Sequence, residues 1–117
     1  MKNNGLKLAV VTGANKEFAT KIVSNYFESY FDVLINGEDV KNSKPSPEPY
    51  LKALELLKLS SQEVLVIENA PLGIKSAKNA NLEVLALQTT LEKSKLKEAD
   101  LIFKNHEDLF QYVKQNI

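Results

Sequence analysis

Apolar residues follow two different periods along the chain. Short apolar runs rich in β-branched residues predict strands at 6–12, 31–36, 63–68, 83–87 and 101–103. Apolar residues spaced three or four apart predict helices at 16–29, 47–57, 71–80, 91–98 and 108–116. Strands separated by helical segments predict right-handed βαβ units. We therefore expect an α/β fold with a three-layer, Rossmann-like, mostly parallel sheet, formed by residues 1–117 as a single domain.

The stretch 64–82 gives the sharpest local prediction. Its strand is expected to be buried on both faces and to end in Glu68, followed by Asn69. Pro71 suits the first position of a helix, where its missing N–H costs nothing. The apolar stripe of that helix is Ile74, Ala77 and Ala80, and Asn81 stands where a left-handed residue commonly ends a helix.

The other helices carry similar signals. Ser46 is the expected N-cap of the helix at 47–57, with Pro47 at its first position and Tyr50 on its buried face. In the last helix Leu109, Phe110 and Val113 are expected to point inward, whereas His106 is expected at the surface.

Composition narrows the functional classes. The chain has 117 residues, 44% hydrophobic and 26% charged, with zero net charge and no cysteine. This balance is typical of a globular protein and gives no indication of a nucleic-acid partner or of a membrane-spanning segment. The absence of cysteine fits an intracellular protein, and we expect a cytoplasmic one. Because all 15 basic residues are lysine, the positive charge that meets a bound anion must come from a lysine ammonium group rather than from the bidentate fork of an arginine.

Three features follow predicted strands and should meet at one edge of a parallel sheet. They are Thr12 with Gly13 and Ala14, then Lys44, then Glu68 with Asn69. A hydroxyl with following N–H groups and a lysine suit a phosphate, and a carboxylate with a carboxamide suits Mg²⁺. The alternative interpretation is that Thr12 only ends a strand, Lys44 is solvated, and Glu68 and Asn69 cap the next helix.

The ordered stretches VVTGA, FDVLINGEDVKNSKPSPEPYLKALELL and VLVIENAPLGIKSAKNANLEVLAL resemble the haloacid dehalogenase-like hydrolases, in particular their phosphatases and β-phosphoglucomutase-like members. The resemblance covers about residues 7–90. It implies that Thr12 binds phosphate, that Lys44 stabilises the transferring phosphoryl group, and that Glu68 and Asn69 lie at the Mg²⁺ site. The neutral Asn69 departs from the common form of this motif, in which two acids stand side by side.

A larger departure is the absence of the D-x-D strand with which the family begins, and of the cap domain that follows it. None of the four aspartates (Asp32, Asp39, Asp100 and Asp108) occurs in that pattern. The resemblance therefore covers only the C-terminal part of the family's core. In the family the D-x-D strand lies between the strands that match 6–12 and 63–68. Those two strands are thus expected either to pair directly or to leave a space that another segment or chain fills.

The resemblance implies Mg²⁺-dependent phosphoryl transfer or hydrolysis on a small phosphorylated metabolite. Because the nucleophilic aspartate is missing, we expect this chain to be inactive alone. Self-association or pairing with a separate N-terminal segment would then be needed to complete the site. The alternatives are a non-catalytic module that binds a phosphorylated ligand or a protein, and a truncated gene product.

Overall fold

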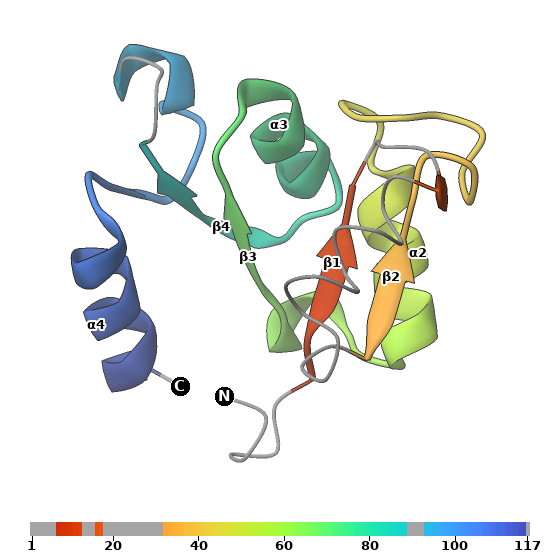
Figure 1. Ribbon diagram of the computed structural model, residues 1–117, viewed down its shortest axis with the longest axis horizontal. Coiled ribbons are helices and arrows are strands. Elements are labelled where there is room, and N and C mark those ends of the chain that lie inside the picture. Colours follow the sequence, from red (N-terminus) through yellow and green to blue (C-terminus); the bar gives the residue numbers. More distant parts are fainter. Residues whose placement is uncertain (1–6, 13–15, 18–31, 89–92, 117) are drawn as a thin grey trace.

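The computed structural model describes residues 7–12, 16–17, 32–88 and 93–116 (Figure 1). The described residues form five strands and three helices, with short 3₁₀ turns before β3 and before β5, the second of which lies where a helix was predicted at 91–98. The strands are β1 (Ala9–Val11), β2 (Val33–Ile35), β3 (Leu65–Glu68), β4 (Glu83–Leu87) and β5 (Leu101–Phe103). The helices are α2 (Glu48–Leu57), α3 (Pro71–Asn79) and α4 (His106–Asn116), and the 3₁₀ turns are Ser61–Glu63 and Lys93–Leu96.

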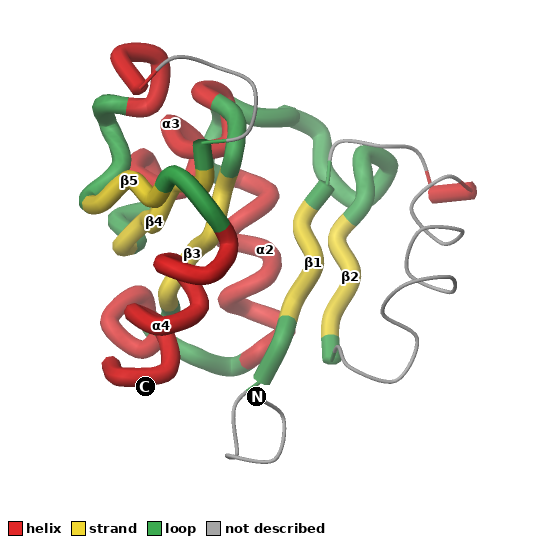
Figure 2. The backbone as a smooth tube through the Cα atoms, turned by 60° about the vertical axis from the view of Figure 1, so that its left-hand side comes forward, coloured by secondary structure: helices red, strands yellow, loops and turns green. Residues whose placement is uncertain are grey.

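The strands form two parallel sheets. β1 pairs with β2, and Val10 lies opposite Leu34. β4 lies between β3 and β5, with Leu85 opposite both Ile67 and Leu101. The predicted α/β class with parallel strands is confirmed. Among the described residues, however, β1 does not pair with β3, so the structure does not show the first of the two expected arrangements, in which these strands pair directly. In Figure 2, β1 and β2 stand apart from β3, β4 and β5.

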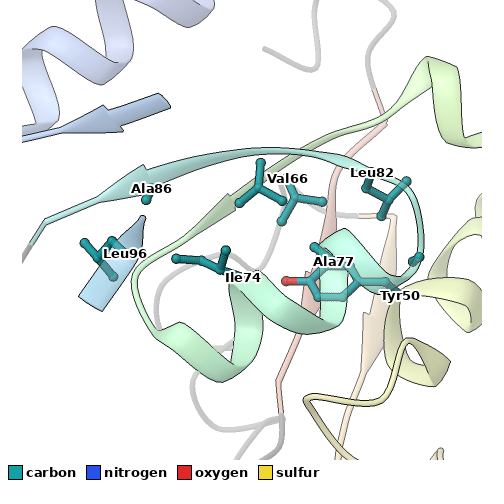
Figure 3. Close-up of a cluster of buried hydrophobic side chains, with 9 residues drawn as sticks. Tyr50, Val66, Ile74, Ala77, Leu82, Ala86 and Leu96 are labelled. Carbon is teal, nitrogen blue, oxygen red and sulfur yellow. The ribbon is translucent and has the colours of Figure 1, made fainter. Parts of the chain in front are cut away.

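Helices cover both faces of the three-stranded sheet. α3 and the start of α2 pack on one face, around a core of nine buried residues (Figure 3). These are Tyr50, Val66, Ile74, Ala77, Ala80, Leu82, Val84, Ala86 and Leu96. α4 packs on the other face through Leu109 and Val113, which contact the buried Leu85 and Leu87. α2 also packs against β1 and β2, so this helix spans the two sheets.

The features of α3 predicted from the sequence are mostly confirmed. Pro71 is its first residue, and Ile74 and Ala77 are buried as predicted. The buried Ala80 ends the helix, and Asn81 adopts the expected left-handed conformation at φ 63°. Lys58 ends α2 in the same way at φ 60°, a stop signal that the sequence did not reveal because lysine has no special preference for it.

The start of α2 differs from the prediction by one residue. Pro47 is the N-cap and Glu48 is the first helical residue. The predictions that Ser46 is the N-cap and that Pro47 is the first helical residue are therefore wrong. The Ser46 hydroxyl still accepts the Glu48 N–H at 3.2 Å. The Glu48 carboxylate accepts the N–H groups of Lys41 and Asn42, which holds the preceding loop against the helix.

Two predicted core positions are exposed. Phe110 is 58% exposed, because α4 begins at His106 and turns Leu109 and Val113, rather than Phe110, toward the sheet. Ile67 is 50% exposed, which contradicts a strand buried on both faces. α4 covers the neighbouring strand β4 instead. His106 is exposed, as predicted.

Some predictions fall outside the described residues. These are most of the helix at 16–29, of which only Lys16 and Glu17 are described, and residues 91–92 of the short helix at 91–98. None of the helices described here is long and apolar enough to cross a membrane.

Candidate active site

Lys44 joins the carboxyl ends of β1 and β3. Its ammonium group donates hydrogen bonds to Glu68 Oε1 at 2.6 Å and to the Val11 carbonyl oxygen at 3.2 Å. Lys44 lies in the loop after β2, and Glu68 is the last residue of β3. The ion pair is largely shielded from water, with side-chain exposures of 18% for the lysine and 9% for the glutamate. Residues far apart in sequence therefore meet where the strands end.

Tyr50 is the third member of this cluster. Its hydroxyl group donates a short hydrogen bond to Glu68 Oε1, the same oxygen that Lys44 contacts. The Lys44 ammonium also lies 5.3 Å from the centroid of the Tyr50 ring, within the range of a cation–π contact. Burial, and then the negative charge of Glu68, raise the pKa of Tyr50, so its hydroxyl remains a proton donor well above neutral pH.

Gly73 makes room for the Glu68 carboxylate. A Cβ atom at Gly73, in the first turn of α3, would lie 2.2 Å from the carboxylate carbon and from both oxygens. No real contact is this short, so glycine is required for the observed position of Glu68. The carboxylate is thus enclosed by the start of α3, the Lys44 ammonium and the Tyr50 hydroxyl.

A family model described as haloacid dehalogenase-like hydrolase matches residues 1–87. The chain belongs to this family. It is 36% identical over 115 residues to a Caldanaerobacter subterraneus protein described as a pyrophosphatase, PpaX. The alignment covers 97% of this chain and 52% of the relative. It is 38% identical over 84 residues to a Thermotoga maritima phosphorylated carbohydrates phosphatase, covering 71% of this chain and 39% of the relative.

Comparison with solved structures leads to the same family. A Thermotoga maritima protein described as a β-phosphoglucomutase superposes with a TM-score of 0.90 and 32% identity, covering 99% of this chain and 56% of that protein. The family predicted from the sequence is therefore confirmed. The chain spans about half the length of the relatives that it matches.

Within this haloacid dehalogenase-like fold, the predicted site residues are only partly brought together. Lys44 and Glu68 are in direct contact. Thr12 directly follows Val11, whose carbonyl group accepts the Lys44 bond, and the Thr12 N–H is bound to the Ile35 carbonyl oxygen. Asn69 is exposed in the turn before α3. Gly13 and Ala14 lie outside the described residues.

Sequence reasoning missed the roles of Tyr50 and Gly73. Tyr50 was predicted to be buried, and it is, but the stripe pattern says nothing about the partner of its hydroxyl group. The one available signal was the spacing that places a tyrosine in the first turn of the helix that follows Lys44. Gly73 could have attracted attention because a glycine inside a helix normally lowers stability.

The donor set partly fits a magnesium ion. Among the described residues, no group of three or more histidine, cysteine, aspartate or glutamate side chains could hold a metal. Glu68 and Asn69 nevertheless offer one carboxylate and one carboxamide oxygen at a strand end. Mg²⁺ commonly binds one or two carboxylates and takes its other ligands from water and phosphate. These residues are therefore suited to part of a Mg²⁺ coordination shell.

Proposed function

We propose that this chain carries the phosphate- and cation-binding part of a phosphoryl-transfer site for a small phosphomonoester. The observation that carries the proposal is the Lys44–Glu68 pair at the ends of β1 and β3. Membership of the haloacid dehalogenase-like hydrolases supports it, as does similarity to a phosphatase named for phosphorylated carbohydrates. We also propose a cytoplasmic location.

In this proposal Thr12 and the N–H groups of Gly13 and Ala14 bind the phosphate oxygens. The Lys44 ammonium group has a third N–H beyond those that bind Val11 and Glu68, and it stabilises negative charge as it develops on the phosphoryl group. Glu68 and Asn69 would hold Mg²⁺, which when bound neutralises charge on phosphoryl oxygens. Residues 1–117 contain no D-x-D strand, so in this proposal the attacking carboxylate is supplied from outside these residues.

One observation favours a second function, a non-catalytic module that binds a phosphorylated ligand. Glu68 and Lys44 satisfy each other, and Tyr50 fixes the same carboxylate oxygen. A cluster that is already paired in this way can bind an anion through Lys44 without supplying a nucleophile. Both functions predict phosphate binding, and they differ in whether a carboxylate supplied in trans produces turnover.

The test measures phosphate binding and hydrolysis separately. Inorganic phosphate with Mg²⁺ should raise the thermal midpoint of the chain, while hydrolysis of p-nitrophenyl phosphate by the chain alone should be negligible. Lys44→Met should abolish the phosphate-dependent shift, whereas Lys41→Met, in the same loop and exposed, should retain it. Thr12→Val provides a second variant that leaves the Lys44–Glu68 pair in place.

Two results would contradict the proposal. A chain whose thermal midpoint does not respond to phosphate has no phosphate site. Robust Mg²⁺-dependent hydrolysis by the chain alone, lost in Lys44→Ala, would show that the nucleophile is already present.

A further inference from the structure

α3 carries a second row of residues beside its buried apolar stripe. The apolar stripe packs in the core, as Figure 3 shows for Ile74 and Ala77. Gly73, Ser76 and Asn79 are spaced by three residues, so they follow one another along a neighbouring row of the helix. Each member of this second row lies against a part of the candidate site.

Ser76 and Asn79 hold the loop that carries Lys44. The Ser76 hydroxyl group donates a hydrogen bond to the Ser46 carbonyl oxygen at 2.6 Å. The Asn79 side-chain amide donates a hydrogen bond to the Pro45 carbonyl oxygen at 3.1 Å. These two carbonyl groups belong to the residues that directly follow Lys44. The loop is therefore joined to α3 at two successive positions.

The position of Lys44 depends on these contacts, because its own backbone has little support. Lys44 lies outside every helix and strand, in the segment between β2 and α2. Within the described part of the chain, the N–H and carbonyl groups of Lys44 make no hydrogen bond. The lysine side chain is a flexible four-carbon stem, so its geometry alone does not fix the ammonium group. The ammonium group stays beside Glu68 only while the loop backbone is held.

Ser76 is the stronger of the two attachments. Its side chain is fully buried, so water does not replace the bond to the Ser46 carbonyl group. A serine inside a helix often binds a carbonyl group of the preceding turn, whereas this hydroxyl group reaches across to the loop. Removing it would leave the Ser46 carbonyl group without this donor, which is costly where water is scarce. The bond from Asn79 is exposed, so water competes with it.

α3 thus positions both members of the Lys44–Glu68 pair. Gly73 leaves room for the Glu68 carboxylate. Ser76, one turn further along the same helix, holds the loop of Lys44. Three residues of helix span only about 4.5 Å, a short and stiff connection. The 2.6 Å contact between the Lys44 ammonium group and Glu68 Oε1 is therefore set by one helix.

We propose that Ser76 is a positioning residue for Lys44 and that Asn79 assists it. Ser76 acts through the Ser46 carbonyl group and not on the phosphate itself. The part of the inference that concerns phosphate rests on the proposed function, whereas the part that concerns the Lys44–Glu68 pair does not. Residues that hold a binding group in place typically change affinity or activity by about 10–100-fold when they are replaced.

The test compares Ser76→Ala with a matched control on the same helix. Ile74→Val removes one methyl group from a buried side chain that packs in the core rather than against the loop. Calorimetry measures the dissociation constant for inorganic phosphate with Mg²⁺, at a temperature where every variant is folded. Ser76→Ala should weaken binding by about tenfold, and Ile74→Val should stay within about twofold of the parent. Asn79→Ala should weaken binding by a smaller factor than Ser76→Ala.

A second measurement needs no phosphate. NMR of protein with isotope-labelled lysine follows the exchange of the Lys44 ammonium protons with water, and Lys44→Met identifies the signal. The ion pair is largely shielded, so this exchange should be slower than that of the exposed Lys41. Ser76→Ala should make it faster by about fivefold or more, because the loop opens more often. Ile74→Val should leave the exchange rate unchanged, since a loss of core packing does not release the loop.

The proposal is overturned if Ser76→Ala binds phosphate as tightly as a parent that binds it, if its Lys44 protons exchange at the parental rate, or if Ile74→Val has the same effects. If Ser76→Ala does not fold, Asn79→Ala decides by the same two measurements, and parental values in it overturn the proposal. A parent that does not bind phosphate contradicts the proposed function, and the ammonium exchange then decides the role of Ser76. Phosphate binding that Ser76→Ala retains in full contradicts only the positioning role.

Discussion

Replacing Gly73 with alanine should destabilise the chain, although glycine to alanine inside a helix is normally favourable. The expected gain in helix propensity is about 1 kcal/mol. Here the new methyl carbon would lie 2.2 Å from the carboxylate of Glu68. That carboxylate has little freedom to move, because Lys44 and Tyr50 both hold its Oε1.

The magnitude follows from the contacts that must break. A hydrogen bond to a charged group is worth about 1.5–3 kcal/mol, and the Tyr50 bond to Glu68 is of this kind. The ion pair with Lys44 is largely shielded, so its disturbance adds to the loss. Set against the gain of about 1 kcal/mol in propensity, Gly73→Ala should lower the free energy of unfolding by about 1–3 kcal/mol.

Urea denaturation of four chains tests this argument: the parent, Gly73→Ala, Glu68→Ala and the double variant. With Glu68 truncated the close contact disappears, so adding Gly73→Ala should then stabilise by about 1 kcal/mol. Lys75→Ala, at an exposed position of α3, controls for general effects on the helix. A Gly73→Ala chain as stable as its parent, or the same change in both backgrounds, would refute the reasoning.

Two further predictions concern stability and pH. Tyr50→Phe keeps the ring and removes the hydroxyl donor of a bond to a charged group, so it should lower the free energy of unfolding by about 1.5–3 kcal/mol at neutral pH. Because the folded pKa of Tyr50 is raised, this contribution is full below about pH 10 and should shrink at higher pH. A difference between the two chains that stays constant up to about pH 11 would contradict this prediction. Asp100 accepts hydrogen bonds from the Val84 N–H at 2.7 Å and from Lys78 at 2.9 Å, which lower its pKa. The stabilisation by the Asp100 carboxylate should therefore be present above about pH 4 and be lost as the pH falls further. In denaturation curves, Asp100→Asn should be less stable than the parent by about 0.5–1 kcal/mol at pH 7, a value reduced because the Asp100 side chain is partly exposed. Near about pH 2 the two chains should be equally stable.

The sequence by itself determined the local elements and the residues at the ends of strands. The Pro71 start, the Ile74 and Ala77 stripe and the Asn81 stop depend on backbone preferences and on helical period, and these act over a few residues. Lys44 and Glu68 were identified as site residues because parallel strands end at one edge and because their motifs match a family. The structure shows that the two side chains are in contact, and their role as site residues stays a prediction.

Only the tertiary structure decided which atoms meet. Tyr50 and Glu68 are 18 residues apart, and Lys44 and Val11 are 33 apart, so their hydrogen bonds depend on how α2 packs across two sheets. The same packing leaves Ile67 half exposed, separates β1 from β3 and makes Gly73 necessary. Hydrophobic periodicity predicts that a face is buried, but it carries no information about the neighbour that covers it, and an open strand edge has no pattern of its own.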